Sequence, residues 1–200
     1  MLTYIHMSQS RQQSVIMFTD IVGYTALMGN DERIAYALLD KNRKLQRPLI
    51  EAFHGRWIKE IGDGVLASFQ TVSEAVHAAV KIQEACNLAK DFQLRIGIHQ
   101  GEIVFEAEDI FGNAVNIAAR IQAAASPGCI FISESIHSAV IDVPEIATRF
   151  VKEEMLRNVA QPVRMYQVLF EGSEIVIPDD PLVHNSIAVL PFVNMSSDQE

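Results

Sequence analysis

Apolar runs alternate along the chain with stretches of helical period. The run "SVIMF" at 14–18 predicts a buried strand. The stretch 29–55 predicts an amphipathic helix, because its apolar residues recur at three- and four-residue spacing, at Ile34, Leu38, Leu45, Leu49 and Phe53. Asn30 is placed to cap this helix, and Pro48 is expected to kink or break it near its end.

The next stretches predict a hairpin followed by further helices and strands. "RWIKEI" (56–61) and "VLASF" (65–69) read as strands joined by Gly62-Asp63-Gly64, since glycine permits the positive φ of a tight turn. We then expect a helix over 71–89, a strand pair over 94–106 bent at Gly101, a helix over 110–125, a strand over 128–133, a short helix, and two or three terminal strands ending at 163–170. This interleaving predicts an α+β fold with a mixed sheet and helices on one face.

The residue composition of the chain changes after Phe170. Residues 171–185 contain Pro178, Asp179, Asp180 and Pro181 in a row, which is typical of a linker, and "SIAVLPFVNMSSDQE" (186–200) then opens like a new strand. We therefore predict an N-terminal extension over 1–13, one domain over 14–170, a linker over 171–185 and the start of a following module over 186–200.

Composition excludes several classes of protein. The chain has 200 residues, 49% of them hydrophobic and 20% charged, which favours a packed fold. A net charge of −9 without a Lys/Arg-rich block disfavours binding to nucleic acid. With neither a signal peptide nor a membrane-spanning run, the expected location is cytoplasmic. Cys86 and Cys129 fit no metal or redox spacing and are expected to be core residues.

Two aspartates are candidate ligands for divalent cations. Asp20 ends the first strand, and Asp63 lies on the turn of a hairpin that could pack beside that strand. Converging carboxylates suit Mg²⁺ or Mn²⁺, and a pair of such ions commonly serves in-line attack at phosphorus. The alternative is that Asp20 caps the following turn and Asp63 is simply a good hairpin residue.

The turn after Asp20 favours the first interpretation. Ile21, Val22, Gly23 and Tyr24 would present successive backbone N–H groups at a helix start, which can cradle a phosphate. The chain has no GxxxxGK[ST] motif, so this turn is not a P-loop.

A later helix supplies a second group of candidate residues. Asn116 and Arg120 have i, i+4 spacing, with Asp109 at the helix entrance. The guanidinium could stabilise charge on a transferring phosphoryl group, and the amide could orient a sugar. Lys59 lies four residues before Asp63. The alternatives are a solvated helix face with an N-cap aspartate and an ordinary surface lysine.

At this point the chain resembles a class III nucleotidyl cyclase catalytic domain. The stretches that carry the resemblance are "FTDIVGYTALM", "HGRWIKEIGDGVLASF", "LRIGIHQGEIVF", "DIFGNAVNIAARIQAAASPGCIFIS" and "LRNVAQPVRMYQV". They occur in the family's order and span Ser14 to Phe170. The segment 186–200 resembles the start of a TolB-like module found after such domains.

The resemblance implies a ferredoxin-like core, a head-to-tail homodimer, and conversion of ATP to cyclic AMP and pyrophosphate. It implies two divalent cations held by Asp20, Asp63 and the carbonyl of Ile21. It further assigns the base to Lys59 and Asp109, the ribose and the transition state to Asn116 and Arg120, and the triphosphate to Arg157.

The two base-reading positions agree with the chemistry of adenine. Adenine offers a ring-nitrogen acceptor to Lys59 and an amino donor to Asp109, whereas guanine reverses this pattern. Members selective for guanine typically have Glu and Cys at these positions. The resemblance therefore favours ATP over GTP.

Two departures from the family pattern concern the triphosphate, since Arg157 replaces the usual lysine and Asn158 a common glycine. Among competing interpretations, a degenerate domain that only dimerises or regulates commonly lacks a metal aspartate or the arginine, and both are present here. A cyclase that joins two GTP molecules would need a GG[DE]EF turn, which "EIGDGV" does not match. An RNA-binding module would need a basic surface and exposed aromatic residues.

Overall fold

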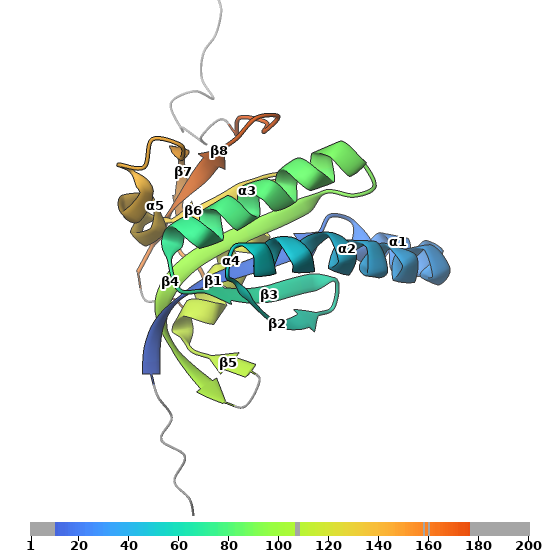
Figure 1. The fold of residues 1–200 in the computed structure, drawn as a ribbon, viewed down its shortest axis with the longest axis horizontal. Coiled ribbons are helices and arrows are strands. Elements are labelled where there is room, and N and C mark those ends of the chain that lie inside the picture. Colours follow the sequence, from blue (N-terminus) through green and yellow to red (C-terminus); the bar gives the residue numbers. More distant parts are fainter. Residues whose placement is uncertain (1–10, 107–108, 158, 160, 177–200) are drawn as a thin grey trace, which may run out of the picture.

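The computed structural model describes residues 11–106, 109–157, 159 and 161–176. Within them the chain folds around one eight-stranded sheet, shown in Figure 1. In chain order the elements are β1 (Arg11–Ile21), α1 (Tyr24–Asn30), α2 (Glu32–Ala52), β2 (Arg56–Ile61), β3 (Gly64–Phe69), α3 (Val72–Ala89), β4 (Leu94–Glu106), β5 (Asp109–Phe111), α4 (Asn113–Ala124), β6 (Ile130–Ser133), α5 (Glu134–Val140), β7 (Ala147–Glu154) and β8 (Val163–Leu169).

The sheet is mixed, as predicted. Its order is β2-β3-β1-β4-β6-β8-β7, with β5 paired to β4 off this path. Only β4 and β6 are parallel among the strand pairs of the described residues. The first half of the domain has the ferredoxin-like arrangement, with elements in the order β1-α2-β2-β3-α3-β4 and antiparallel strands in the order β2-β3-β1-β4. The predicted α+β fold class is therefore confirmed.

Helices cover both faces of the sheet, so the prediction of helices on one face is wrong. Val15 and Met17 pack toward α2 and α3, while Ile16 and Phe18 pack toward α4 on the opposite face. In Figure 1, α2 and α3 lie in front of the sheet and α4 lies behind it. The strand is apolar in consecutive positions because a sheet covered on both faces buries both sides of its central strand.

Two predicted element boundaries are wrong around Gly101. Residues 94–106 form the single strand β4 instead of a bent pair, since β1 pairs with it continuously from Arg11 to Ile21. The predicted helix over 110–125 begins only at Asn113, because 109–111 form β5 and return along the end of β4. Gly101 therefore serves close packing, as an added Cβ would lie 2.9 Å from the Cβ of Ala114.

Helix α2 also differs from its prediction. Asp31, not Asn30, caps it, by accepting a hydrogen bond from the N–H of Ile34 at 3.1 Å. The helix continues past Pro48 to Ala52. Its fully buried positions are Ala35, Asn42, Gln46 and Ile50, whereas Ile34 is 51% exposed. The other four predicted apolar residues pack, partly buried, against the same core, so the predicted face borders a buried stripe whose centre holds two amides.

Cys86 and Cys129 are free and buried, as predicted, and burial raises the pKa of their thiols to about 12 and about 11. The chain after β8 also packs on the domain as far as the described residues reach. The buried amide of Gln167 donates to the carbonyl of Glu174 at 2.6 Å and accepts from the N–H of Val176 at 2.9 Å. The start of the predicted linker is therefore attached to the sheet.

Two domain boundaries can be compared with these elements. Strand β1 begins at Arg11, inside the predicted extension over 1–13. The predicted module over 186–200 lies outside the described residues. None of the helices in the described part of the chain has the length and hydropathy needed to cross a lipid bilayer.

His99 makes stability depend on pH. It lies on β4, its Nδ1 shares a hydrogen bond with the hydroxyl of Ser133 at 2.8 Å, and burial lowers its pKa from 6.5 to about 4. The unfolded chain therefore takes up this proton at a higher pH than the folded chain does. We expect wild type to lose up to about 2 kcal/mol more stability than His99→Gln when the pH falls from 7 to 5.

Urea unfolding at both pH values measures this difference. His54→Gln is the control, because the side chain of His54 is 83% exposed and should follow wild type. Equal losses in wild type and His99→Gln would contradict the prediction.

Candidate active site

Asp20 and Asp63 lie together at one end of the sheet. Strand β3 pairs with β1, which brings the β2–β3 turn beside the end of β1, and Asp63 accepts a hydrogen bond from the N–H of Ile21 at 2.9 Å. Burial raises the pKa of Asp63, and the neighbouring charge of Asp20 raises it further. Two carboxylates are thus held close together despite their repulsion.

A buried polar network on α2 holds the hairpin in place. The hydroxyl of Thr19 donates to Gln46 at 3.0 Å, Gln46 donates to Asn42, and Asn42 donates to the carbonyl of Asp63 at 3.4 Å. Gly64 allows the close approach of hairpin and strand, since a Cβ there would lie 2.5 Å from the carbonyl oxygen of Thr19. Sequence analysis missed this network because it read α2 only for its apolar residues.

Arg95 is a further residue that the sequence analysis missed. It lies directly opposite Asp20 in the β1–β4 pairing, and its guanidinium forms an ion pair with the Asp20 carboxylate. Its Nε is buried and has no hydrogen-bond partner among the described residues. The register of β1 against β4 decides this contact, and no local sequence signal reveals it.

The donor set at this end of the sheet fits a hard divalent cation. Asp20, Asp63 and the carbonyl of Ile21 offer oxygen ligands only. No group of three or more His, Cys, Asp or Glu side chains that could hold a metal occurs among the described residues. Mg²⁺ commonly binds through one or two carboxylates together with substrate phosphates, so two aspartates are sufficient.

The turn after Asp20 agrees only partly with the predicted phosphate cradle. The N–H of Val22 donates to the carbonyl of Gln93 at 2.9 Å, so it is not available to a phosphate in this structure. Gly23 has a φ of 76° and is the N-cap of α1, without a side-chain capping bond. The alternative role of Asp20 as a cap of this helix is therefore wrong. The leading N–H groups of a helix lack intrahelical acceptors, so Gly23 and Tyr24 remain candidates.

Tyr24 has a structural side chain. It is 8% exposed and belongs to the core beneath α1 and α2. Burial raises the pKa of its hydroxyl, and the charge of Asp63 contributes in the same direction. Only the backbone of Tyr24 is therefore placed to meet a ligand.

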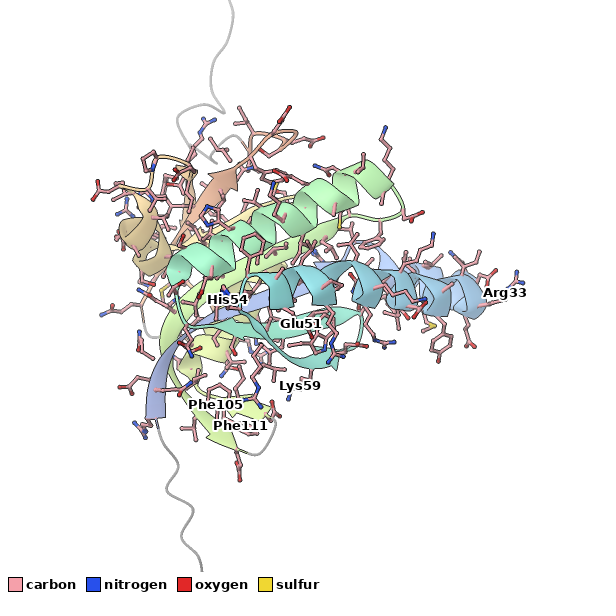
Figure 2. All side chains as sticks on the ribbon, in the orientation of Figure 1. Arg33, Glu51, His54, Lys59, Phe105 and Phe111 are labelled. Carbon is pink, nitrogen blue, oxygen red and sulfur yellow. The ribbon has the colours of Figure 1, made fainter. Side chains whose placement is uncertain are left out.

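Lys59 and Asp109 form an ion pair between β2 and β5. The bond from Lys59 lowers the pKa of Asp109, and the N–H of Ile110 adds to this effect. Asp109 does not cap α4, because the N-cap is Gly112, so the N-cap part of the predicted alternative is wrong. Lys59 and Asn116 line one cavity of about 220 Å³, with Ile61, Leu66, Ile110, Phe111, Gly112 and Val115. Lys59 and Phe111 lie at the lower edge of the ribbon in Figure 2.

Arg120 and Arg157 line a second cavity, of about 450 Å³, at the other end of α4. Asn116 and Arg120 are exposed on α4, and the i, i+4 spacing sets one at each cavity. Neither cavity includes Asp20 or Asp63 among its lining residues. The predicted residues therefore form two groups in one chain, the carboxylates at the end of β1 and the others around α4.

Comparison with known proteins identifies the family. The model of the "Adenylate and Guanylate cyclase catalytic domain" family matches residues 6–169. "Putative adenylate cyclase 3" of Rhizobium meliloti is 35% identical over 95% of this chain and 35% of its own length. The "pH-sensitive adenylate cyclase MT1302" of Mycobacterium tuberculosis is 30% identical over 78% of this chain and 41% of its own. The chain thus spans between about a third and two fifths of these curated relatives.

Solved structures of cyclases have the same fold as this chain. An adenylate/guanylate cyclase/hydrolase from Silicibacter pomeroyi has a TM-score of 0.75 at 34% identity, covering 81% of this chain and 99% of that one. The adenylyl cyclase CyaB from P. aeruginosa has a TM-score of 0.74 at 23% identity over 80% and 95% of the two chains, which shows the shared fold. The ferredoxin-like core with a helix on its second face is thus the class III nucleotidyl cyclase fold. The chain belongs to the family of adenylate and guanylate cyclase catalytic domains.

Proposed function

We propose that this domain is an adenylate cyclase, a phosphorus–oxygen lyase that converts ATP to 3′,5′-cyclic AMP and pyrophosphate. The observation that carries the proposal is the Lys59–Asp109 ion pair beside the cavity that Lys59 and Asn116 line. Two of the relatives carry the name adenylate cyclase, one of them as a putative one, which supports the same activity.

The ion pair favours adenine over guanine. The Lys59 ammonium donates to a ring nitrogen of adenine, and the Asp109 carboxylate accepts from the exocyclic amino group. Against guanine, Lys59 would face a ring N–H and Asp109 a carbonyl oxygen. An unpaired polar group costs about 1–3 kcal/mol, so we expect ATP to be preferred by at least about fivefold.

Asp20, Asp63 and the carbonyl of Ile21 would hold the divalent cations, Mg²⁺ or Mn²⁺. When bound, these cations lower the pKa of the ribose 3′-hydroxyl and neutralise charge on the triphosphate. Asp20 already pairs with the positive charge of Arg95, and the charge of Asp20 raises the pKa of Asp63. A cation bound between the two aspartates would take the place of the Arg95 guanidinium on Asp20 and relieve the repulsion between the carboxylates.

The other residues act on the nucleotide itself. Asn116 orients the ribose so that its 3′-oxygen attacks the α-phosphorus, the bond to pyrophosphate breaks, and the hydroxyl proton passes to water. Arg120 stabilises the charge that develops on the transferring phosphoryl group, and Arg157 holds the departing pyrophosphate. No covalent intermediate with the protein is needed.

The separation of the two residue groups supports a head-to-tail homodimer. The cavities around α4 include neither Asp20 nor Asp63, so one chain does not gather the whole set around one cavity. Two antiparallel copies would place the carboxylates of each against the α4 residues of the other, giving two equivalent sites.

The test is product formation by the purified chain with Mg²⁺ or Mn²⁺, offered ATP and GTP separately. We expect cyclic AMP from ATP, with a loss of about a thousandfold in Asp63→Ala, because several kcal/mol of charge stabilisation disappears. Asp91→Ala is the matched control, since Asp91 is an aspartate in a surface ion pair with Lys41. If no cyclic nucleotide forms at concentrations where the chain is dimeric, the proposal is overturned and a regulatory module is favoured.

A further inference from the structure

The cavity at the C-terminal end of α4 contains one more basic side chain than the two arginines to which the proposed function gives a role. Its lining includes three cationic side chains, Arg120, Lys152 and Arg157, and one carboxylate, Glu154. The chain as a whole carries a net charge of −9. A local excess of positive charge in an acidic protein indicates a site for an anion.

Lys152 reaches this cavity because of an irregularity in β7. The pairing of β7 with β8 shifts register between Phe150 and Lys152, and such bulges re-aim side chains. Lys152 and Glu154 alternate with Glu153, which lies 3.9 Å from Arg164. The bulge thus turns Lys152 and Glu154 toward the cavity beside α4. Glu153 does not line this cavity and lies near Arg164 instead.

The three cations differ in their partners. Lys152 forms an ion pair with Glu154 at 2.8 Å, and the two side chains are 30% and 46% exposed. Arg120 and Arg157 have no carboxylate within 4.0 Å in the described part of the chain. An anion that enters the cavity therefore meets two guanidiniums directly and competes with Glu154 for Lys152.

We propose that Lys152 is a third cationic contact for the phosphate chain of the nucleotide and for pyrophosphate, and that Glu154 holds it until the phosphates bind. The inference rests on the proposed function, because it names the polyphosphate as the ligand of this cavity. Lys152 then contributes to affinity for the phosphates, and Glu154 opposes that affinity by pairing with Lys152 and repelling the anion.

This competition predicts effects of opposite sign at two neighbouring residues. Lys152→Gln should weaken binding of a polyphosphate by about two- to fivefold, the range of a partly exposed charge pair. Glu154→Gln should strengthen it by a similar factor. If the Lys152–Glu154 pair only stabilised β7, the two variants would change binding in the same direction or leave it unchanged.

The experiment is calorimetric titration of the whole chain with inorganic pyrophosphate, in chelator and at low salt, for wild type and both variants. Lys152→Arg should restore affinity. Lys81→Gln is the matched control, because Lys81 pairs with Glu84 at 2.6 Å on α3 and does not line this cavity. The KM for ATP should rise in Lys152→Gln by the factor seen in calorimetry, with kcat nearly unchanged.

Three results would overturn the inference, and they differ from a failure of the proposed function. They are unchanged affinity in both variants, parallel weakening of both, and no pyrophosphate binding by a wild type that forms cyclic AMP. Opposite shifts in a chain that forms no cyclic AMP would uphold the cavity as a polyphosphate site and overturn only the adenylate cyclase assignment.

Discussion

A mixture of Asp20→Ala chains and Arg120→Ala chains is expected to form cyclic AMP, although each variant alone is nearly inactive. Alone, each should lose about a thousandfold, because the first lacks a cation ligand and the second lacks the cation that stabilises the transition state. In a mixed dimer one site receives Asp20 from one chain and Arg120 from the other. Its second site carries both defects.

The expected recovery can be estimated by counting sites. Random exchange gives about half mixed dimers, each with one working site of two, so activity should return to about a quarter of wild type. The product assay at equal total chain concentration measures this value, after native mass spectrometry has shown that mixed dimers form.

The matched control is a mixture of Asp20→Ala and Asp63→Ala chains. Both aspartates lie at the end of β1, so every site in that mixture lacks at least one of them and no recovery is expected. Recovery in the control, or none in the first mixture despite demonstrated mixed dimers, would contradict a site shared between subunits.

Gly97→Ala is expected to destabilise the domain by at least about 3 kcal/mol, the upper range for an added core methyl. A Cβ at Gly97 would lie 2.2 Å from the backbone nitrogen of Gln122 and 2.6 Å from the carbonyl oxygen of Ala118. Both atoms belong to the backbone of α4, so no side-chain rotation relieves the overlap and the helix must move. The corresponding fall in Tm is roughly 6–12 °C.

This movement should also reduce activity per folded molecule. Helix α4 carries Asn116 and Arg120, and a displacement of about 1 Å at such residues can cost about a hundredfold in rate. Gly29→Ala is the control, because a Cβ there meets nothing within 4 Å, and it should leave stability unchanged or raise it by up to about 1 kcal/mol. Equal melting temperatures for the two variants would contradict the packing argument.

Most elements of the fold follow from local pattern. The alternation of strands and helices, the Gly62-Asp63-Gly64 hairpin and the turn after Asp20 depend on residues close in sequence, so they were predicted from period and turn chemistry. The errors occur where the tertiary environment overrides the local signal. Residues 109–111 form β5 because β4 extends far enough to pair with them, and Gly101 stays within a strand because β1 continues beside it.

The residues of the candidate site also fall into those that the sequence indicated and those that only the structure revealed. Motif spacing identified Asp20, Asp63, Lys59, Asp109, Asn116 and Arg120 as candidates, and the family resemblance added Arg157. It did not identify Arg95 or the amides of Asn42 and Gln46, because their contacts come from strand register and from the rotation of α2. Lys152 was missed because its approach to Arg120 depends on the bulge in β7.

The sequence by itself determined the mixed α+β fold and the identity of the polar residues that carry the proposed chemistry, because hydrophobic period and turn residues act within a few positions along the chain. Only the tertiary structure decided which polar residues meet, that α4 covers the second face of the sheet, and that the carboxylates and the α4 residues lie in separate groups. These features depend on register and close packing between segments distant in sequence, where a shift of one residue or the addition of one methyl changes every contact.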